Sequence, residues 1–575
     1  MTLPSPSRRE FIIRVSSVSA VISAGAVLSA CGGDSAAEAQ FSYGVASGDP
    51  LSDRVILWTH SQFADSANNV ELLYEVATDN EFTSSSVVSS GFVNATPSTN
   101  FTAKVDATGL QAGKTYFYRF KSGRTTSPVG KTRTLPASSA TEVKFAVFSC
   151  SNYPEGFFNV YGLASQSDAQ YAIHLGDYLY EYPNGVYPTA PTASRIHQPS
   201  TEIYSLADYR TRHAQYKTDP NLKTLHASMP MIAVWDDHEI ANDAYKDGAE
   251  NHDAAKEGTF AARKAAALKA YHEWMPIRTG SDQNIIYRSF DFGNVLSLHM
   301  LDTRLIGRDK QVEFSELLNP ATAATAQASL YSPSRELLGG TQGTWLNGKI
   351  ASSAATWQVL GQQVLMARVE FPVSVLSVLN PDTLTDPAAL AAGTAAINDY
   401  VVAKNTPAGS RTPTQSALMD PRINPKLGYN LDAWDGYPVA REKLLATILG
   451  ANKRLVVLAG DTHNAWNSQL TLAGLLSPSQ AGLIVGEEFA TPSVNSVGFE
   501  SYFTTLPSAT VKSIFESVPD DVKWLDPSRR GYLKMTFTKT QAKGEWVFVN
   551  TVKSGTYSVE TPVAAETRTY FADAV

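Results

Sequence analysis

The segment KFAVFSC, residues 144–150, joins an apolar run typical of a buried β-strand to a cysteine at its carboxyl end. The chain has 575 residues but only two cysteines. The other, Cys31, ends LSAC (28–31) behind an apolar run, where a lipoprotein signal peptide would be cut and acylated. Cys150 then has no disulfide partner in the mature protein. Two interpretations of this thiol are open: a small buried hydrophobe or a metal ligand.

Three further strand-like runs end in polar clusters, and this repetition favours the metal ligand. Strands of this kind that alternate with amphipathic helices, such as 205–217 and 255–274, predict a layered α/β domain. Ligands of such domains bind beyond the carboxyl ends of the strands. The clusters are GDYLY (176–180), DDHE (236–239) and GDTH (460–463), after expected strands 171–175, 231–235 and 454–459; further strands are expected at 295–301 and 357–365.

The parts of the chain around this domain have different patterns. Residues 41–137 alternate in short strands with a turn about every dozen residues, which predicts a small antiparallel β-sandwich. Residues 367–430 break the rhythm with Pro, Ala and Thr, and we interpret them as an insertion, with a lid as one role to test. Residues 531–538 and 545–550 predict two closing strands.

The N-terminus has the layout of an export signal. SRREFI (7–12) precedes an apolar stretch without charge, and the paired arginines indicate the twin-arginine export machinery. An ordinary Sec signal or a membrane anchor is the alternative. We expect a signal peptide over 1–31, a linker over 32–40, and an exported protein, periplasmic or extracellular. Its contact with the membrane would be through a lipid anchor at Cys31.

Composition limits the partners. Hydrophobic residues make up 43% of the chain, enough to bury a large core, and the formal net charge is -8. An acidic chain of this kind is a poor match for nucleic acid, because phosphate-backbone binding depends on excess Lys and Arg. We expect a monomer, in which any phosphate chemistry is local and depends on cations placed in one site.

Six motifs together resemble the PhoD-type alkaline phosphatases of the metallophosphoesterase superfamily. The resemblance covers nearly the whole mature chain in order. It implies a calcineurin-like layered α/β catalytic domain over 138–575, preceded by the β-sandwich over 41–137. The motifs are FSYGVASGDP (41–50), FSCSN (148–152), WDDHE (235–239), LDTR (301–304), WDGY (434–437) and GDTH (460–463).

The resemblance implies a pair of metal ions. The ligands it implies for a ferric ion (Fe3+) are Cys150, Asp177, Tyr180 and His463, with Asp177 bridging to a second ion that in this family resembles calcium (Ca2+). The ligands it implies for the second ion are Asp237 and Asp461, with Asn242 as a further candidate.

Residue chemistry agrees with this choice of ions. Thiolate and phenolate favour a strongly Lewis-acidic ion, and a carboxylate-rich pocket favours Ca2+, Mg2+ or Mn2+. Zn2+ is less expected, because the chain has only ten histidines and Asp461 stands where zinc-type relatives commonly place another.

The expected reaction is hydrolysis of phosphate monoesters by metal-bound hydroxide, with diesters as further candidates. His238 is expected to give a proton or hydrogen bond to the phosphate or leaving group; the alternative is a structural residue that packs on Glu239. Arg304 is expected to bind phosphate oxygens; the alternative is an ion pair with Asp302.

Two other functions are open from the sequence. One is a phosphodiesterase or phospholipase D-like hydrolase, in which the insertion 367–430 shapes a groove. The other is a non-catalytic surface binding protein with structural metals. Relative rates on monoesters and diesters distinguish the first, and a metal-loaded but hydrolytically silent preparation would favour the second.

Overall fold

The computed structural model describes residues 38–64, 67–188, 191–192, 194–376, 387–560 and 566–572. The predicted signal peptide, most of the linker and Cys31 lie outside the described residues and stay predictions. Within the described ranges, no helix is long and apolar enough to cross a membrane.

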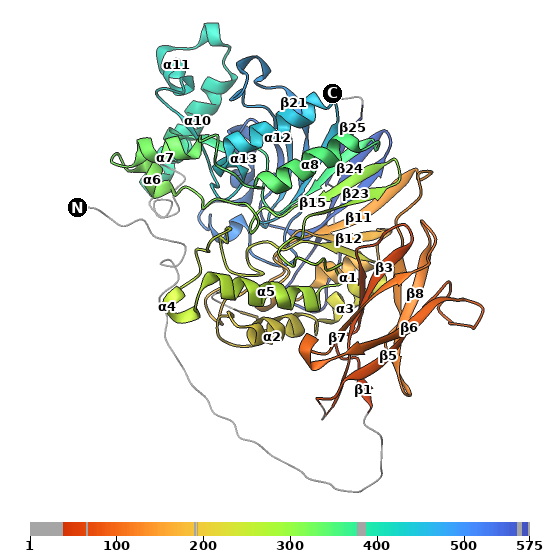
Figure 1. Ribbon diagram of the computed structural model, residues 1–575. Coiled ribbons are helices and arrows are strands. Elements are labelled where there is room, and N and C mark those ends of the chain that lie inside the picture. Colours follow the sequence, from red (N-terminus) through yellow and green to blue (C-terminus); the bar gives the residue numbers. More distant parts are fainter. Residues whose placement is uncertain are drawn as a thin grey trace.

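Two large mixed β-sheets form the centre of the described structure (Figure 1). The first sheet contains, in spatial order, β25 (Glu566–Phe571), β24 (Gln541–Val549), β23 (Arg530–Thr538), β11 (Glu142–Phe148), β12 (Tyr171–His174), β13 (Met231–Ala233), β2 (Val45–Gly48), β3 (Arg54–His60) and β7 (Thr102–Thr108). The second contains β14 (Arg288–Phe292), β15 (Leu296–Met300), β16 (Trp357–Gly361), β19 (Arg454–Ala459), β21 (Ile484–Ala490), β20 (Ala465–Thr471) and β22 (Val522–Asp526). The predicted strands of the α/β domain and the two closing strands are confirmed.

The two sheets pack face to face through aromatic side chains. Phe145 of β11 lies 5.0 Å from Phe292 of β14, and Trp357 of β16 lies 6.4 Å from Phe537 of β23, between ring centres. Alternate residues of β19 are buried on opposite faces, since Val456 joins this inner core and its neighbours join the core beneath the outer helices. Burial on both faces explains why the strands read as continuous apolar runs.

Helices cover the outer faces of both sheets (Figure 1). On the first sheet lie α1 (Asn159–Ser165), α2 (Leu206–Tyr216), α3 (Pro220–Ser228) and α5 (Phe260–Trp274), and on the second lie α8 (Gly340–Ser352), α12 (Pro438–Gly450) and α13 (Ser508–Ser517). Further helices are α4 (Ala254–Glu257), α6 (Phe314–Leu318), α7 (Ala323–Leu330) and α9 (Val373–Leu376). The domain is therefore layered α/β, as predicted.

The N-terminal strands form two layers, but one layer belongs to the first large sheet. β2, β3 and β7 extend that sheet from β13, whereas the other layer is a separate sheet of β10 (Gly130–Arg133), β8 (Thr115–Ser122), β5 (Val70–Ala77) and β6 (Val87–Ala95), with β9 (Thr125–Thr126) on β8. Both layers share one core cluster. The alternating pattern predicts strands, but it does not say which sheet edge they join. A short pair, β1 (Ala39–Gln40) and β4 (Gln62–Phe63), completes this part.

The insertion 367–430 is more regular than its sequence suggests. It contains the antiparallel pair β17 (Glu370–Pro372) and β18 (Lys426–Gly428), and the helices α10 (Pro387–Asn405) and α11 (Pro413–Met419). Lys404 of α10 donates to the carbonyl oxygens of Ser517 and Val518, both at 2.9 Å. This contact holds α10 against the carboxyl end of α13, where a cation interacts well with the helix dipole. A role as a lid stays a prediction.

A buried lysine lies between the N-terminal strands and the α/β layers. Lys217, at the end of α2, places its Nζ atom 3.1 Å from Tyr178 Oη, 3.3 Å from His226 Nε2 and 4.7 Å from the ring centre of Trp58 in β3. Burial lowers the pKa of Lys217 to about 7. The nearby His213 has a pKa well below its usual value, first because of burial and second because of Lys217.

We expect Lys217 to make stability depend on pH. The unfolded chain holds the Lys217 proton up to the usual pKa of 10.5, whereas the folded chain releases it near pH 7. The unfolded state therefore binds more protons between these values, so the free energy of unfolding rises with pH there, by roughly 1 kcal/mol per pH unit. Denaturant unfolding at pH 7.5 and 9.5 should show this rise in the wild type. The rise should shrink in Lys217→Met but not in Lys223→Met, a control on the next helix. Equal slopes in all three proteins would contradict the prediction.

Candidate metal centre

The candidate ligands lie in the turns that follow four strands, at one edge of the two sheets. Cys150, Asp177, Asp461 and His463 have φ angles of 61°, 54°, 62° and 66°. This left-handed backbone is unfavourable for residues other than glycine, and such strain persists mainly at functional sites. Gly176, with φ of 114°, allows the turn after β12 to lie against Asp236, since a Cβ atom there would overlap the Asp236 side chain.

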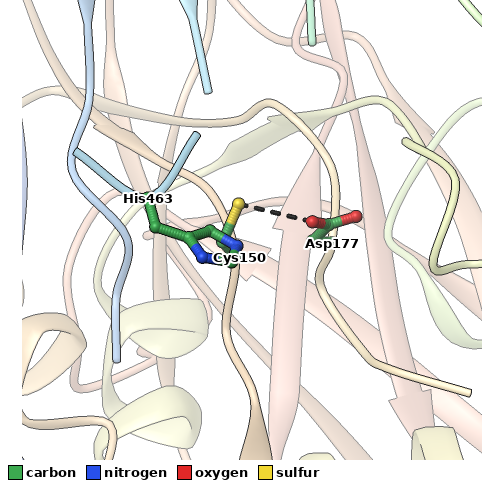
Figure 2. A group of neighbouring side chains, drawn as sticks. All are labelled: Cys150, Asp177 and His463. Atoms are coloured by element: carbon green, nitrogen blue, oxygen red, sulfur yellow. Dashed lines mark hydrogen bonds between the residues drawn. The ribbon is translucent and has the colours of Figure 1, made fainter. Parts of the chain in front are cut away.

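The first cluster joins a thiol, a carboxylate, a phenol and an imidazole. Cys150 Sγ lies 3.4 Å from Asp177 Oδ2, and the His463 ring lies beside both (Figure 2). Tyr180 Oη lies 3.2 Å from the same Asp177 oxygen and 3.1 Å from His463 Nε2. Three of these four side chains are fully buried, and His463 is half-buried. The structure thus brings together the four residues expected at the ferric site.

The hydrogen bonds of the first cluster leave lone pairs that face one another. His463 Nδ1 donates to the Val497 carbonyl at 2.6 Å, so Nε2 carries a lone pair. Asp177 Oδ1 is buried without a hydrogen-bond partner among the described groups. Tyr180 Oη has a single proton for the Asp177 and His463 acceptors. A cation fits this donor set, because it satisfies all of the converging lone pairs.

The acid–base properties of the first cluster agree with cation binding. Burial raises the pKa of the Cys150 thiol well above its usual range, and the Asp177 carboxylate adds to this effect. Burial also raises the pKa of Asp177, although His238 opposes the shift. The ionised forms are therefore unfavourable by themselves, and a bound cation stabilises them.

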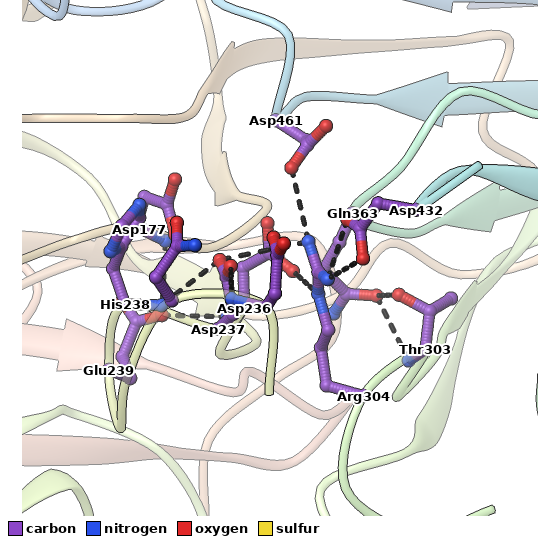
Figure 3. Close-up of polar contacts among 12 residues, drawn as sticks. Asp177, Asp236, Asp237, His238, Glu239, Thr303, Arg304, Gln363, Asp432 and Asp461 are labelled. Atoms are coloured by element: carbon purple, nitrogen blue, oxygen red, sulfur yellow. Dashed lines mark hydrogen bonds and ion pairs between the residues drawn. The ribbon is translucent and has the colours of Figure 1, made fainter. Parts of the chain in front are cut away.

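Carboxylates continue from the first cluster toward the second sheet (Figure 3). Ligand atoms of Asp177, Asp237 and His238 lie within 4.8 Å of one another, and so do those of Asp236, Asp237 and Asp461. Asp177 belongs to the first cluster and to the first of these two groups, so it can bridge two ions. This end of the site is rich in oxygen, which hard cations such as Ca2+, Mg2+ and Mn2+ prefer.

Asn242 lies beside this carboxylate group. Its backbone nitrogen donates to Glu181 Oε1 at 2.8 Å, and its side-chain nitrogen contacts Glu250 Oε2 at 3.3 Å. The backbone nitrogen of the next residue, Asp243, donates to Asp237 Oδ2 at 2.6 Å. The turn thus positions a candidate ligand, while direct ligation by Asn242 stays a prediction.

The Arg304 guanidinium is buried among carboxylates (Figure 3). Nε pairs with Asp236, Nη1 pairs with both oxygens of Asp432 at 2.9 and 2.7 Å, and Nη2 lies 3.1 Å from Asp461. The alternative pairing with Asp302 is wrong, because Asp302 Oδ1 accepts the backbone N–H of Arg304 at 2.8 Å instead. Nη2 is the end that faces the metal cluster, and phosphate binding by Arg304 stays a prediction.

His238 is held in one orientation by Glu181. His238 Nδ1 lies 2.7 Å from Glu181 Oε2, and its ring lies 4.2 Å from the Tyr180 ring, between centres. Burial alone would lower the pKa of His238, but the carboxylates of Asp237, Asp177 and Glu181 hold it well above its usual value. The alternative role for His238 is packing on Glu239. The structure does not support it, because His238 bonds to Glu181 and the Glu239 carboxylate instead accepts the backbone N–H groups of Asp236, Asp177 and Tyr178.

We expect Glu181→Gln to reduce kcat on an aryl phosphate by about 10- to 100-fold, because the His238 ring loses its charged partner. KM should change little, since Glu181 is fully buried and its oxygens are bonded to His238, Asn242 and Asn251. The control is Glu202→Gln, which removes a carboxylate paired with Arg263 at 3.0 Å. An unchanged kcat in Glu181→Gln would contradict a positioning role, and thermal unfolding of both variants checks the fold.

Several residues around the site were not predicted from the sequence. Asp432 links the end of the insertion to Arg304 and to Arg308. The segment 493–497 contacts the first cluster through Ser496 Oγ and the Val497 carbonyl. Gln362 and Gln363, which follow β16, bond to neighbouring protein groups: Trp434 and Val364 for Gln362, and Thr303, Trp235 and Leu301 for Gln363.

The chain is similar to known proteins over most of its length. Residues 145–546 match the model of the family described as PhoD-like phosphatase, and residues 26–136 match PhoD-like phosphatase, N-terminal domain. Alkaline phosphatase D of Bacillus subtilis (strain 168) is 34% identical over 520 residues, which cover 88% of this chain and 77% of that protein. A solved structure described as "Structure of PhoD" is 32% identical with a TM-score of 0.73, covering 94% of this chain and 92% of that chain.

The layered fold, the converging ligand side chains and these matches define a metal-dependent hydrolase of phosphoric esters. The chain belongs to the PhoD-like phosphatase family. The family membership predicted from the six motifs is thereby confirmed, and so is the prediction that the protein is an enzyme.

Proposed function

We propose that this protein is an exported alkaline phosphatase that hydrolyses phosphate monoesters with a ferric ion in the first cluster and Ca2+ at the adjacent carboxylates of Asp237 and Asp461. The observation that supports the proposal most directly is the shared carboxylate of Asp177. It lies in the thiol and phenol cluster and also within 4.8 Å of Asp237, where the oxygen-rich group begins. Mg2+ and Mn2+ are alternatives for the second ion, because their ligand preferences overlap with those of Ca2+.

The ligand assignment follows the donor chemistry. We propose Cys150, Asp177, Tyr180 and His463 for the ferric ion, because thiolate and phenolate suit a strongly Lewis-acidic ion. Asp237 and Asp461, with Asn242 as a third candidate, would hold the second ion. Two bound cations supply Lewis acidity for phosphoryl transfer and lower the pKa of bound water.

The protein side chains then orient the substrate and transfer a proton. His238 is fixed by Glu181 and, when protonated, is placed to donate to the phosphate or to the oxygen of the leaving group. Arg304 Nη2, beside Asp461, is placed to contact a phosphate oxygen, while its other nitrogens stay paired with Asp236 and Asp432. The pairing keeps the guanidinium in place before substrate arrives, which is how preorganised charge stabilises a transition state.

The domain and location assignments are part of the same proposal. We assign residues 138–575 to a catalytic domain of the metallophosphoesterase type and 41–137 to an N-terminal β-domain. The paired arginines and Cys31 support export by the twin-arginine route and lipid anchoring, in the periplasm or outside the cell. The twin-arginine route moves folded proteins, so the thiolate site can be loaded in a reducing compartment before export.

The proposal is tested by elemental analysis of the purified protein together with rates on matched aryl phosphate monoesters and diesters. We expect about one iron per chain, calcium in addition, and turnover of the monoester. A diester rate far above the monoester rate would favour the phosphodiesterase or phospholipase D-like alternative. Metal-loaded protein that hydrolyses neither substrate would overturn the proposed activity on these esters.

A further inference from the structure

The segment 493–497, which is separated from β21 by two residues, contacts the first cluster. The Ser493 backbone nitrogen donates to the His463 carbonyl at 3.1 Å, and the Val497 carbonyl accepts from His463 Nδ1 at 2.6 Å. Ser496 Oγ lies 3.0 Å from the Cys150 carbonyl and 3.0 Å from Tyr180 Oη. Ser493 and Ser496 are fully buried. One short segment therefore touches three of the four candidate ferric ligands.

Ser496 is the group that can donate a hydrogen bond to the Tyr180 oxygen. Described partners of Tyr180 Oη are Asp177 Oδ2, His463 Nε2 and Ser496 Oγ. A metal-bound Asp177 carboxylate is ionised and only accepts hydrogen bonds, and His463 Nε2 carries a lone pair because Nδ1 is the protonated nitrogen. The hydroxyl of Ser496 is thus the donor in this set.

The direction of the Ser496 hydroxyl depends on the state of Tyr180. While the phenol keeps its proton, Tyr180 donates to Asp177, and Ser496 donates to the Cys150 carbonyl. A phenol oxygen bound to a cation has lost that proton and is a charged acceptor. Hydrogen bonds to charged acceptors are stronger than those to carbonyls, so the hydroxyl turns toward Tyr180.

Packing keeps the phenol ring in place for this contact. The Tyr180 ring lies 4.2 Å from the His238 ring and 5.7 Å from the Tyr187 ring, between centres. Because the His238 and Tyr187 rings both pack against it, the Tyr180 ring has little room to turn its oxygen toward another donor. The Ser496 hydroxyl and the phenol oxygen therefore face each other through packing that does not depend on the metal.

We propose that Ser496 is a positioning residue of the metal centre, which donates a hydrogen bond to the metal-bound phenol oxygen of Tyr180 and sets how much charge that oxygen gives to the ion. The inference rests on the proposed function, because it requires Tyr180 to ligate the ferric ion. Outer hydrogen bonds of this kind commonly orient ligands and tune the bound metal.

The visible spectrum of the ferric holoenzyme tests the proposal. Removing the donor in Ser496→Ala leaves more electron density on the phenol oxygen, so its charge-transfer band to iron should move to longer wavelength. Ser496→Cys keeps the shape and a weak donor, and its band should move in the same direction by less. We also expect kcat on an aryl phosphate to fall by about 10- to 100-fold in Ser496→Ala.

Ser151→Ala is the matched control. Ser151 is a fully buried serine at the same sheet edge, but its hydroxyl donates to the Tyr178 carbonyl at 2.8 Å and to no candidate ligand side chain. Its band should stay at the wild-type position. If Ser496→Ala fails to fold, as judged by thermal unfolding, Ser496→Cys alone decides.

Three results would overturn the proposal. The first is a band that does not move in either Ser496 variant, and the second is an equal shift in Ser151→Ala. The third is ferric-loaded wild-type protein without a phenolate band, since Tyr180 would then not be a charged acceptor. Hydrolysis in that same preparation separates this failure from failure of the proposed function, because active protein without the band keeps the phosphatase assignment.

Discussion

Asp177→Asn is expected to lower the turnover of an aryl phosphate monoester by more than about 1000-fold, beyond the effect of one lost electrostatic contact. Asp177 is the carboxylate common to the thiol and phenol cluster and to the group that contains Asp237. An amide nitrogen cannot ligate a cation, so Asn offers one oxygen without charge where the carboxylate offers two. Both metals should therefore bind more weakly in the variant, and elemental analysis should show substoichiometric content of each.

The fold should survive this substitution. Asn has nearly the shape of Asp, and the backbone N–H of residue 177 keeps its bond to Glu239 Oε2 at 3.0 Å. Thermal unfolding of metal-free samples checks this point. Asp168→Asn is the control, since Asp168 pairs with Lys144 and Lys534 at the surface and should keep wild-type turnover. Full turnover in Asp177→Asn would remove the bridging carboxylate from the mechanism.

The sequence predicts the central strands and candidate ligands because both depend on local pattern. An apolar run such as 454–459 is buried on both faces, so its ends are visible in the sequence, and the next polar residues must lie at the sheet edge. The predicted helix 255–274 is divided, since Gly258, with φ of 80°, ends α4 and Thr259 caps the start of α5. A left-handed glycine explains the difference.

The missed residues depend on contacts that are distant along the chain. β21 lies beside β19, yet it contains Glu487 and Glu488, so its sequence lacks an apolar strand pattern. Glu488 is nevertheless buried, because it accepts the backbone N–H groups of Met366 and Ala367. Since this strand was not predicted, the segment 493–497 that follows it was not recognised as part of the site.

The ion pairs of Arg304 also depend on contacts that are distant along the chain. Its partner Asp432 is 128 positions away and follows an insertion without a strong pattern. The sequence pattern predicted either a phosphate-binding guanidinium or an ion pair with Asp302, whereas the structure pairs Arg304 with Asp236, Asp432 and Asp461. Residue type predicts which groups gather at the sheet edge, but the pairing among them is decided by tertiary contacts.

The Cys150→Ser variant is expected to lose its ferric ion to a mild chelator that leaves the iron of the wild-type protein bound. A serine hydroxyl does not ionise near neutral pH, so the variant replaces a thiolate ligand by a neutral oxygen. We expect retained iron to fall by about tenfold or more, and turnover to fall in parallel, because outer contacts alone already change metal affinity by about 10- to 100-fold. Calcium removal should inactivate the wild type reversibly while its iron stays in place.

Cys150→Ala separates ligation from packing. If Cys150 were only a small buried hydrophobe beside Asp177, the apolar Ala would be tolerated better than the polar Ser, because burying an unpaired hydroxyl is unfavourable. If Cys150 is a ligand, Ala and Ser should lose iron to the same extent, even where thermal unfolding ranks Ala as the more stable. Iron retained in Cys150→Ala after the chelator wash would contradict ligation, because the remaining groups would then hold the ion without sulfur.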